Sequence, residues 1–199
     1  MFWKYFDSIQ VAFIGNSQMH DDINPAYITD FFSRNFAVGG GDLRWTIRFT
    51  EDYILNHCRN LRAIVMSLHM PMFFIPNGDI SWSTGFSLSK GYIFDKNHSF
   101  WTSYVPESFR IQMSKIPVYM YNIDSLGFAS FPSNNWGGEN PPGGPVSDSI
   151  TDPVYLQNMQ LLKEMVKKIS SKGIKTILVQ FPVSPAYASK PYYMQGGPS

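Results

Sequence analysis

The sequence has little of what marks disulfide-rich, nucleic-acid-binding or membrane-spanning proteins. Its single cysteine, Cys58, cannot form an internal disulfide, and one thiol leaves the cellular compartment open. Sixteen basic residues stand against fifteen acidic ones, so the formal net charge of +1 provides no field for nucleic acid or an anionic membrane. No apolar run approaches the roughly 20 residues that cross a bilayer. We therefore expect neither nucleic acid as a partner nor a membrane span, while the oligomeric state stays open.

The chain is long enough for one substantial core. Its 199 residues are 44% hydrophobic, which predicts a single domain over residues 1–199. The aromatic start, Met1–Tyr5, lacks the basic and apolar regions of a signal peptide. The last residues, Met194–Ser199, read as a loop after a strong strand, which is an unusual place for an α/β domain to finish. We therefore expect a piece of a longer chain.

Short apolar runs alternate with amphipathic segments near both ends of the chain. The predicted strands cover Gln10–Ile14, Phe36–Val38, Leu61–Met66 and Lys175–Phe181. Such alternation is typical of a parallel sheet covered by helices on both faces. We predict an α/β fold, a three-layer α/β/α sandwich with a mostly parallel sheet, whose ligands bind near the carboxyl ends of the strands.

Start and stop signals place the helices between these strands. Asn24 followed by Pro25 predicts one helix, and Asp42 is a suitable cap for the next. The clearest helix runs from about Pro153 to Lys172, with Asp152 as its cap and Gly173 as its stop. The apolar residues that we expect these three helices to bury are Ile28, Phe31 and Phe32, then Leu43, Ile47 and Ile54, then Tyr155, Met159, Leu162, Val166 and Ile169.

Residues 71–150 differ from the rest and read as an insertion. They are crowded with aromatics, glycine and proline, with a short helix predicted over residues 107–113 and a loop over 134–145. Its aromatics could form a platform for sugar rings, although at least half of them should pack the insertion's own core. Those aromatics are Trp82, Tyr92, Trp101, Tyr104 and Trp136, of which Trp101 and Trp136 are the substrate-binding candidates.

Three strand ends carry groups suited to acyl transfer. The first strand runs into Gly15-Asn16-Ser17-Gln18 and a helix, which would hold a serine hydroxyl at the open edge of the sheet near free amides. A Gly-x-Ser turn with a capping serine is the more ordinary reading of that motif alone. The second strand continues as FAVGGGDL, with Gly41 before a helix start, and the third ends in Ser67-Leu68-His69-Met70.

The order and spacing of these blocks resemble the SGNH/GDSL hydrolase superfamily over about residues 9–70 and 152–187. The resemblance implies an SGNH hydrolase or flavodoxin-like fold, with Ser17 as the nucleophile. It also implies that the amides of Ser17 and Gly41 hold the oxyanion. In that superfamily the asparagine of a third block, Gly-x-Asn-Asp, is a further donor. Asn16 replaces the usual aspartate, and SLHM replaces Gly-x-Asn-Asp. His69 therefore occupies the donor position, where a neutral imidazole could donate a hydrogen bond or simply pack at the strand end.

The resemblance also implies an Asp-x-x-His block, in which histidine takes the serine proton and aspartate orients the imidazole. That block should follow Ser184, so our leading expectation is that the histidine lies outside this chain. One Asp-x-x-His is present, at Asp95 to His98, but it precedes the helix and strand that should come before it. A loop histidine near the substrate or a solvated turn is the alternative role for His98.

Other site types fit the sequence less well. The residues His20, Asp21 and Asp22 could suggest a metal site, but no metal-ligand spacing with His57 or His98 is evident, and polar residues here usually cap and solvate a helix. The glycine triplet lacks the G-x-G-x-x-G spacing of a dinucleotide fingerprint. We therefore expect no metal and no organic cofactor.

The function that we expect is hydrolysis of an ester by a serine nucleophile through an acyl-enzyme. The substrate class is a small-molecule or glycan ester, and the aromatic insertion favours an acylated, for instance acetylated, carbohydrate. The alternative is a non-catalytic carbohydrate-binding or structural domain that keeps the fold, for which the divergent SLHM is the main support. Resemblance alone makes a bacterial secreted or cell-surface location an expectation.

Overall fold

The described part of the chain is organised around a parallel sheet. The computed structural model describes residues 5–38, 41–74, 76, 126, 128 and 150–182. Its four strands are β1 (Val11–Ile14), β2 (Ser33–Asn35), β3 (Ala63–Ser67) and β4 (Lys175–Val179). They lie in the order β2-β1-β3-β4 and all pair in parallel. The predicted α/β class and parallel sheet are therefore confirmed for these residues.

The central strand β1 is apolar and buried at every position because both of its faces are covered. In β1, Ala12 and Ile14 join the larger core cluster, whereas Val11 and Phe13 join the smaller one on the opposite face. The neighbouring strand β3 divides in the same way, since its side chains alternate between the two faces. This explains why β1 reads as a continuous apolar run rather than as an alternating pattern.

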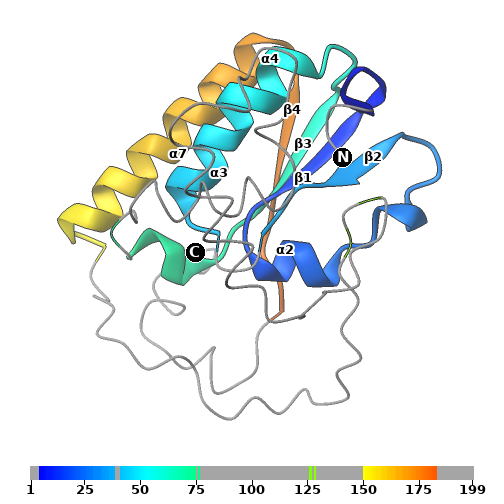
Figure 1. Ribbon diagram of the computed structural model, residues 1–199. Coiled ribbons are helices and arrows are strands. Elements are labelled where there is room, and N and C mark those ends of the chain that lie inside the picture. Colours follow the sequence, from blue (N-terminus) through cyan, green and yellow to red (C-terminus); the bar gives the residue numbers. More distant parts are fainter. Residues whose placement is uncertain are drawn as a thin grey trace, which may run out of the picture.

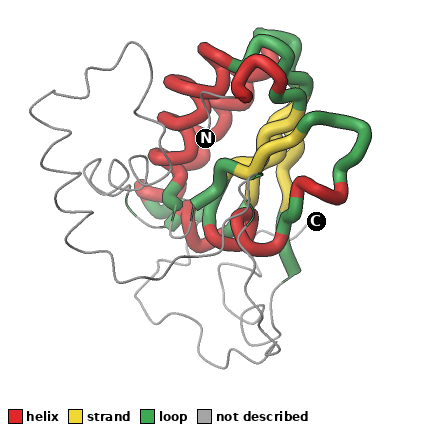
Figure 2. The backbone as a smooth tube through the Cα atoms, turned by 45° about the vertical axis from the view of Figure 1, so that its right-hand side comes forward, coloured by secondary structure: helices red, strands yellow, loops and turns green. Residues whose placement is uncertain are grey.

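Helices cover one face of the sheet most completely. Helix α3 (Leu43–Phe49) continues through the π-helical turn η3 (Thr50–Ile54) into α4 (Leu55–His57). Figure 1 shows α3 (cyan) and α7 (Pro153–Ser171, yellow to orange) side by side over this face, and the turned view of Figure 2 agrees. The shorter helices are α2 (Ser17–Asp22), η1 (Phe6–Ser8), η2 (Pro25–Tyr27) and η4 (Met70–Phe73).

Helix α7 begins and ends where its sequence signals predict. The Asp152 carboxylate accepts hydrogen bonds from the amides of Val154 and Tyr155, at 2.7 and 3.4 Å. Pro153, which has no amide to satisfy, is the first helical residue. Lys172 is the C-cap, and Gly173 follows it. The inward stripe includes Leu162 and Ile169 as expected, together with Met165 and the buried polar residue Asn158.

The second strand and the helix before it differ from their predictions. The strand is Ser33–Asn35 rather than Phe36–Val38, whose apolar side chains are instead buried in the loop that follows. Pro25 starts only a single 3-10 turn, although the Asn24 side chain does accept from the Ala26 amide at 2.9 Å. Phe31 and Phe32 were expected to face inward but are 39% and 37% exposed. The prediction of a helix over this segment was wrong.

The polar residues of β2 are buried because each has a specific partner. The Arg34 guanidinium stacks over the rings of Tyr5 and Phe32, with 4.7 and 4.5 Å to the ring centroids. The Ser33 hydroxyl donates to the Pro25 carbonyl at 3.2 Å. Hydropathy alone misplaces this strand, since it ranks Ser33, Arg34 and Asn35 among the residues that remain in water.

Most of the predicted insertion lies outside the described residues. This applies to the helix predicted over residues 107–113, to the loop over 134–145 and to the end of the chain from residue 183. Within the described segments, no helix combines the length and the apolar character needed to cross a membrane.

Candidate functional site

The loop after β1 is fixed against the end of β3. Gly15 has a φ of +132°, a backbone conformation that L side chains rarely adopt. A Cβ on this residue would lie 2.0 Å from the Ser67 hydroxyl oxygen, so glycine is the residue that fits. The Asn16 amide donates to that same oxygen at 3.2 Å, and Ser67 is fully buried. These contacts set the position from which Ser17 enters α2.

The glycine-rich loop after β2 reaches the same place. The Val38 amide donates to the Gly15 carbonyl at 3.1 Å, and a Cβ on Gly41 would lie 2.8 Å from that carbonyl oxygen. Gly41 is buried, and its own amide donates to the Val38 carbonyl at 3.0 Å. The structure therefore brings the Gly41 and Gly15–Ser17 segments together, with the Gly41 amide bonded to the Val38 carbonyl.

Ser17 is the first residue of α2 and is half-buried. The first amides of a helix have no acceptor within that helix. Among the described residues, none accepts a hydrogen bond from the Ser17 amide. The residue thus presents a hydroxyl and an unused amide at the carboxyl end of β1, where Figure 1 shows α2 leaving the sheet.

Asn35 holds α2 in this position. Its side-chain amide donates to the carbonyls of Met19 and Ile23 at 2.7 and 3.0 Å, at the middle and the end of the helix. Its carbonyl oxygen accepts from the Ala37 amide at 3.0 Å, and the side chain is buried. One side chain of β2 therefore ties the Ser17 helix to the sheet.

His69 lies two residues beyond Ser67 and is half-buried. The intervening Leu68 is paired with β4, since its amide donates to the Val179 carbonyl at 2.7 Å. Burial lowers the pKa of His69 from 6.5 to about 4, because the charged imidazolium loses solvation. His69 is therefore neutral near pH 7, with a proton on one of its two ring nitrogens.

His20 is buried and paired, not solvated as its helix-cap position suggested. Its Nδ1 lies 2.5 Å from the Asp21 carboxylate oxygen, and only 5% of the residue is exposed. Burial and the neighbouring Asp21 raise the pKa of the Asp22 carboxyl. Within the part of the chain that the structure describes, no three His, Cys, Asp or Glu side chains group as metal ligands.

Two of the predicted site elements cannot be placed. The candidate acid-base pair Asp95 and His98 and the candidate sugar platform of Trp101 and Trp136 all lie outside the described residues. Their roles stay predictions from the sequence.

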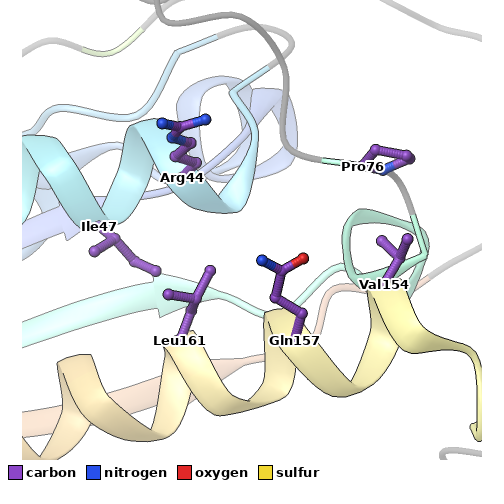
Figure 3. A pocket seen from close by; sticks show the side chains of 6 residues that line it. All are labelled: Arg44, Ile47, Pro76, Val154, Gln157 and Leu161. Atoms are coloured by element: carbon purple, nitrogen blue, oxygen red, sulfur yellow. The ribbon is translucent and has the colours of Figure 1, made fainter.

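A separate pocket of about 470 Å³ lies between α3 and α7. Figure 3 shows Arg44 and Ile47 of α3 on one side and Val154, Gln157 and Leu161 of α7 on the other, with Pro76 near one end. Ser17, Gly41 and His69 do not line this pocket. It therefore gives no information about a substrate at the serine.

Sequence reasoning missed the residues that organise the site. Ser67 and Asn35 are polar groups within strands, and their partners come from other strands or loops. The only available signal was that both are polar residues next to apolar runs. Comparisons of the chain with models of protein families, with curated proteins and with solved structures gave no significant match.

Proposed function

We propose that this chain is a serine ester hydrolase of the SGNH/GDSL type that removes acyl groups, such as acetyl, from a carbohydrate. The observation that supports the proposal most is the convergence of three strand-end segments. Gly15 contacts both Ser67 and Gly41, and Ser17 stands next to this junction with an amide that has no acceptor among the described residues. Carboxyl ends of parallel strands are where α/β enzymes place their sites. The three-layer sandwich of that superfamily belongs to the same proposal.

In this mechanism the Ser17 hydroxyl attacks the ester carbonyl, and its proton passes to a base. The amide of Ser17 stabilises the developing oxyanion, and His69 serves as a neutral donor. The Gly41 amide joins them when its 3.0 Å bond to the Val38 carbonyl opens or is shared. Collapse of the tetrahedral intermediate releases the sugar alcohol, and water then hydrolyses the acyl-enzyme.

The test is ester turnover with matched serine variants. We would measure acetate release from p-nitrophenyl acetate and from an acetylated oligosaccharide, using Ser17→Ala and, as a control, Ser8→Ala. Ser8 is exposed and lies in η1, which precedes the amino end of β1. We expect Ser17→Ala to abolish turnover and Ser8→Ala to retain it. Equal rates in the two variants would contradict the proposal.

The substrate class is tested through the aromatic candidates. Trp101→Ala and Trp136→Ala should raise the KM for the acetylated oligosaccharide while leaving p-nitrophenyl acetate hydrolysis nearly unchanged. Loss of stacking on one sugar-binding aromatic costs about 1–3 kcal/mol by analogy with stacked bases, or roughly 5- to 150-fold in affinity. Parallel losses on both esters would indicate a structural role instead.

The second candidate function is a non-catalytic glycan-binding domain that keeps this fold. The engaged Gly41 amide favours it, because a working oxyanion hole presents its donors unpaired. Glycan binding that survives Ser17→Ala, without turnover of any ester, would support this candidate.

A further inference from the structure

The segment that carries Ser17 also holds buried polar atoms that the proposed mechanism does not yet use. His20 Nε2 and Asn16 Oδ1 have almost no solvent contact, and neither has a hydrogen-bond partner among the described residues. Buried polar groups in proteins nearly always have a partner, so each exception requires an explanation. Asn16 immediately precedes Ser17, and His20 lies three positions after it.

The partner on the other ring nitrogen fixes the protonation of His20. An ionised carboxylate only accepts hydrogen bonds, so the Nδ1 that lies 2.5 Å from Asp21 carries the proton. In the neutral imidazole, Nε2 is then an unprotonated acceptor. This is the tautomer that a histidine needs to take a proton from a serine hydroxyl.

The position of His20 also suits this role. Ser17 and His20 both belong to α2, and residues three apart share a helix face with their Cβ atoms about 5–6 Å apart. Hydrogen bonds of catalytic groups are often long or misaligned before substrate binds. Since His20 Nε2 takes no hydrogen bond from the described residues, Ser17 Oγ must approach it along this helix face when substrate binds.

We propose that the His20–Asp21 pair is the proton acceptor for Ser17, with Asp21 as the residue that orients the ring. This inference rests on the proposed esterase function and supplies the base from within α2 itself. As the bond from Ser17 Oγ to the carbonyl carbon forms, the hydroxyl proton moves to His20 Nε2 and the carbonyl π pair moves to oxygen. When the ester C–O bond breaks, Nε2 returns the proton to the departing alcohol, and a water molecule repeats the sequence in deacylation.

The test is the rate at which a fluorophosphonate probe modifies Ser17, measured by peptide mass mapping of the 199-residue chain. General-base catalysis contributes about 100-fold or more, so His20→Gln should slow modification by at least that factor. Asp21→Asn should slow it less, since the base remains. The matched control is His57→Gln, because His57 is the last residue of α4, which leads to the amino end of β3.

Each result decides a different point. Modification at the wild-type rate in His20→Gln overturns the inference but leaves a reactive Ser17, and with it the proposed function. Loss of modification in His98→Gln and not in His20→Gln assigns the base to His98. This result also overturns the inference and leaves the proposed function standing. Absence of any modification in the wild-type chain overturns the inference, while ester turnover in the assay above still decides the proposed function.

A second measurement needs no variant and covers the case in which His20→Gln fails to fold. Nitrogen-15 spectra of the imidazoles in the wild-type protein should show His20 with a protonated Nδ1 and an unprotonated Nε2. Phenylboronic acid, which forms a tetrahedral adduct with an active serine, should shift the Nε2 resonance toward that of a protonated nitrogen. A protonated Nε2 in the free protein, or an adduct at Ser17 that leaves this resonance unmoved, would overturn the inference.

Discussion

Gly15 and Ser67 approach so closely that no side chain fits at Gly15, two residues before the candidate nucleophile. A methyl group on Gly15 would meet the Ser67 hydroxyl oxygen at 2.0 Å and its Cβ at 3.0 Å. The same hydroxyl accepts the Asn16 amide. These two contacts hold the loop after β1 against the end of β3, directly before the helix that begins with Ser17.

We predict that Gly15→Ala destabilises the protein by about 3–5 kcal/mol, because it adds a clash to an unfavourable φ. Adding Ser67→Ala should recover about 1–2 kcal/mol of that loss, since the oxygen at 2.0 Å is removed while the strain at φ +132° remains. Urea unfolding of the single and double variants measures both effects. Strictly additive losses would show that the two residues do not make this contact.

Asn35→Ala should destabilise the protein by about 2–4 kcal/mol. The substitution leaves the carbonyls of Met19 and Ile23 and the amide of Ala37 without their partner, and the site is buried. Asn56→Ala is the matched control, because Asn56 is exposed and makes one bond of 3.3 Å. It should change the free energy of unfolding by less than about 0.5 kcal/mol. Similar losses in both variants, again by urea unfolding, would contradict the role of Asn35.

Stability should fall in mild acid through His69. Burial lowers its pKa from 6.5 in the unfolded chain to about 4 in the folded protein, so the unfolded chain binds more protons between these values. The contribution of His69 is therefore complete above pH 6.5 and is lost as the pH falls toward 4. From pH 7 to 4.5, the wild type should lose about 1–3 kcal/mol more than His69→Gln. Parallel pH profiles of the two proteins would refute this.

Cys58 should be inert in the folded protein. Burial, with a smaller effect of Asp7, raises the pKa of its thiol to about 12, and the thiolate is the reactive form. Reaction with Ellman's reagent at pH 8 should be at least about 100-fold slower in buffer than in 8 M urea. Complete reaction within a minute in buffer would show that Cys58 is accessible and that its surroundings are not as described.

Elements whose signals are local were predictable from the sequence, whereas those set by long-range partners were not. Helix α7 follows from Asp152, Pro153 and Gly173, which all act within one turn of the helix ends. Strand β2 did not, because the burial of Arg34 depends on the ring of Tyr5, far away in sequence. Its polar residues therefore look like surface residues until their partners are placed.

Part of the candidate site was also predictable from the sequence, and part of it was not. The meeting of Ser17 with the Gly41 loop follows from topology alone, because the carboxyl ends of parallel strands share one edge. The contact of Gly15 with Ser67 did not follow, since it depends on side-chain packing between β1 and β3. The pairing of His20 with Asp21 was also missed, because adjacent polar residues ahead of a loop are usually solvated.

The residues that come before and after the segment 75–149 contact each other. The Phe74 ring stacks on Tyr155 with centroids 4.9 Å apart, and the Asn158 side chain donates to the Phe73 carbonyl at 3.0 Å. Because both ends are anchored to one spot, the loop-closure entropy of the intervening segment grows slowly with its length, by about 0.6 kcal/mol for each doubling. The sheet and the helices that cover it should therefore tolerate inserted segments of very different length and chemistry at this junction.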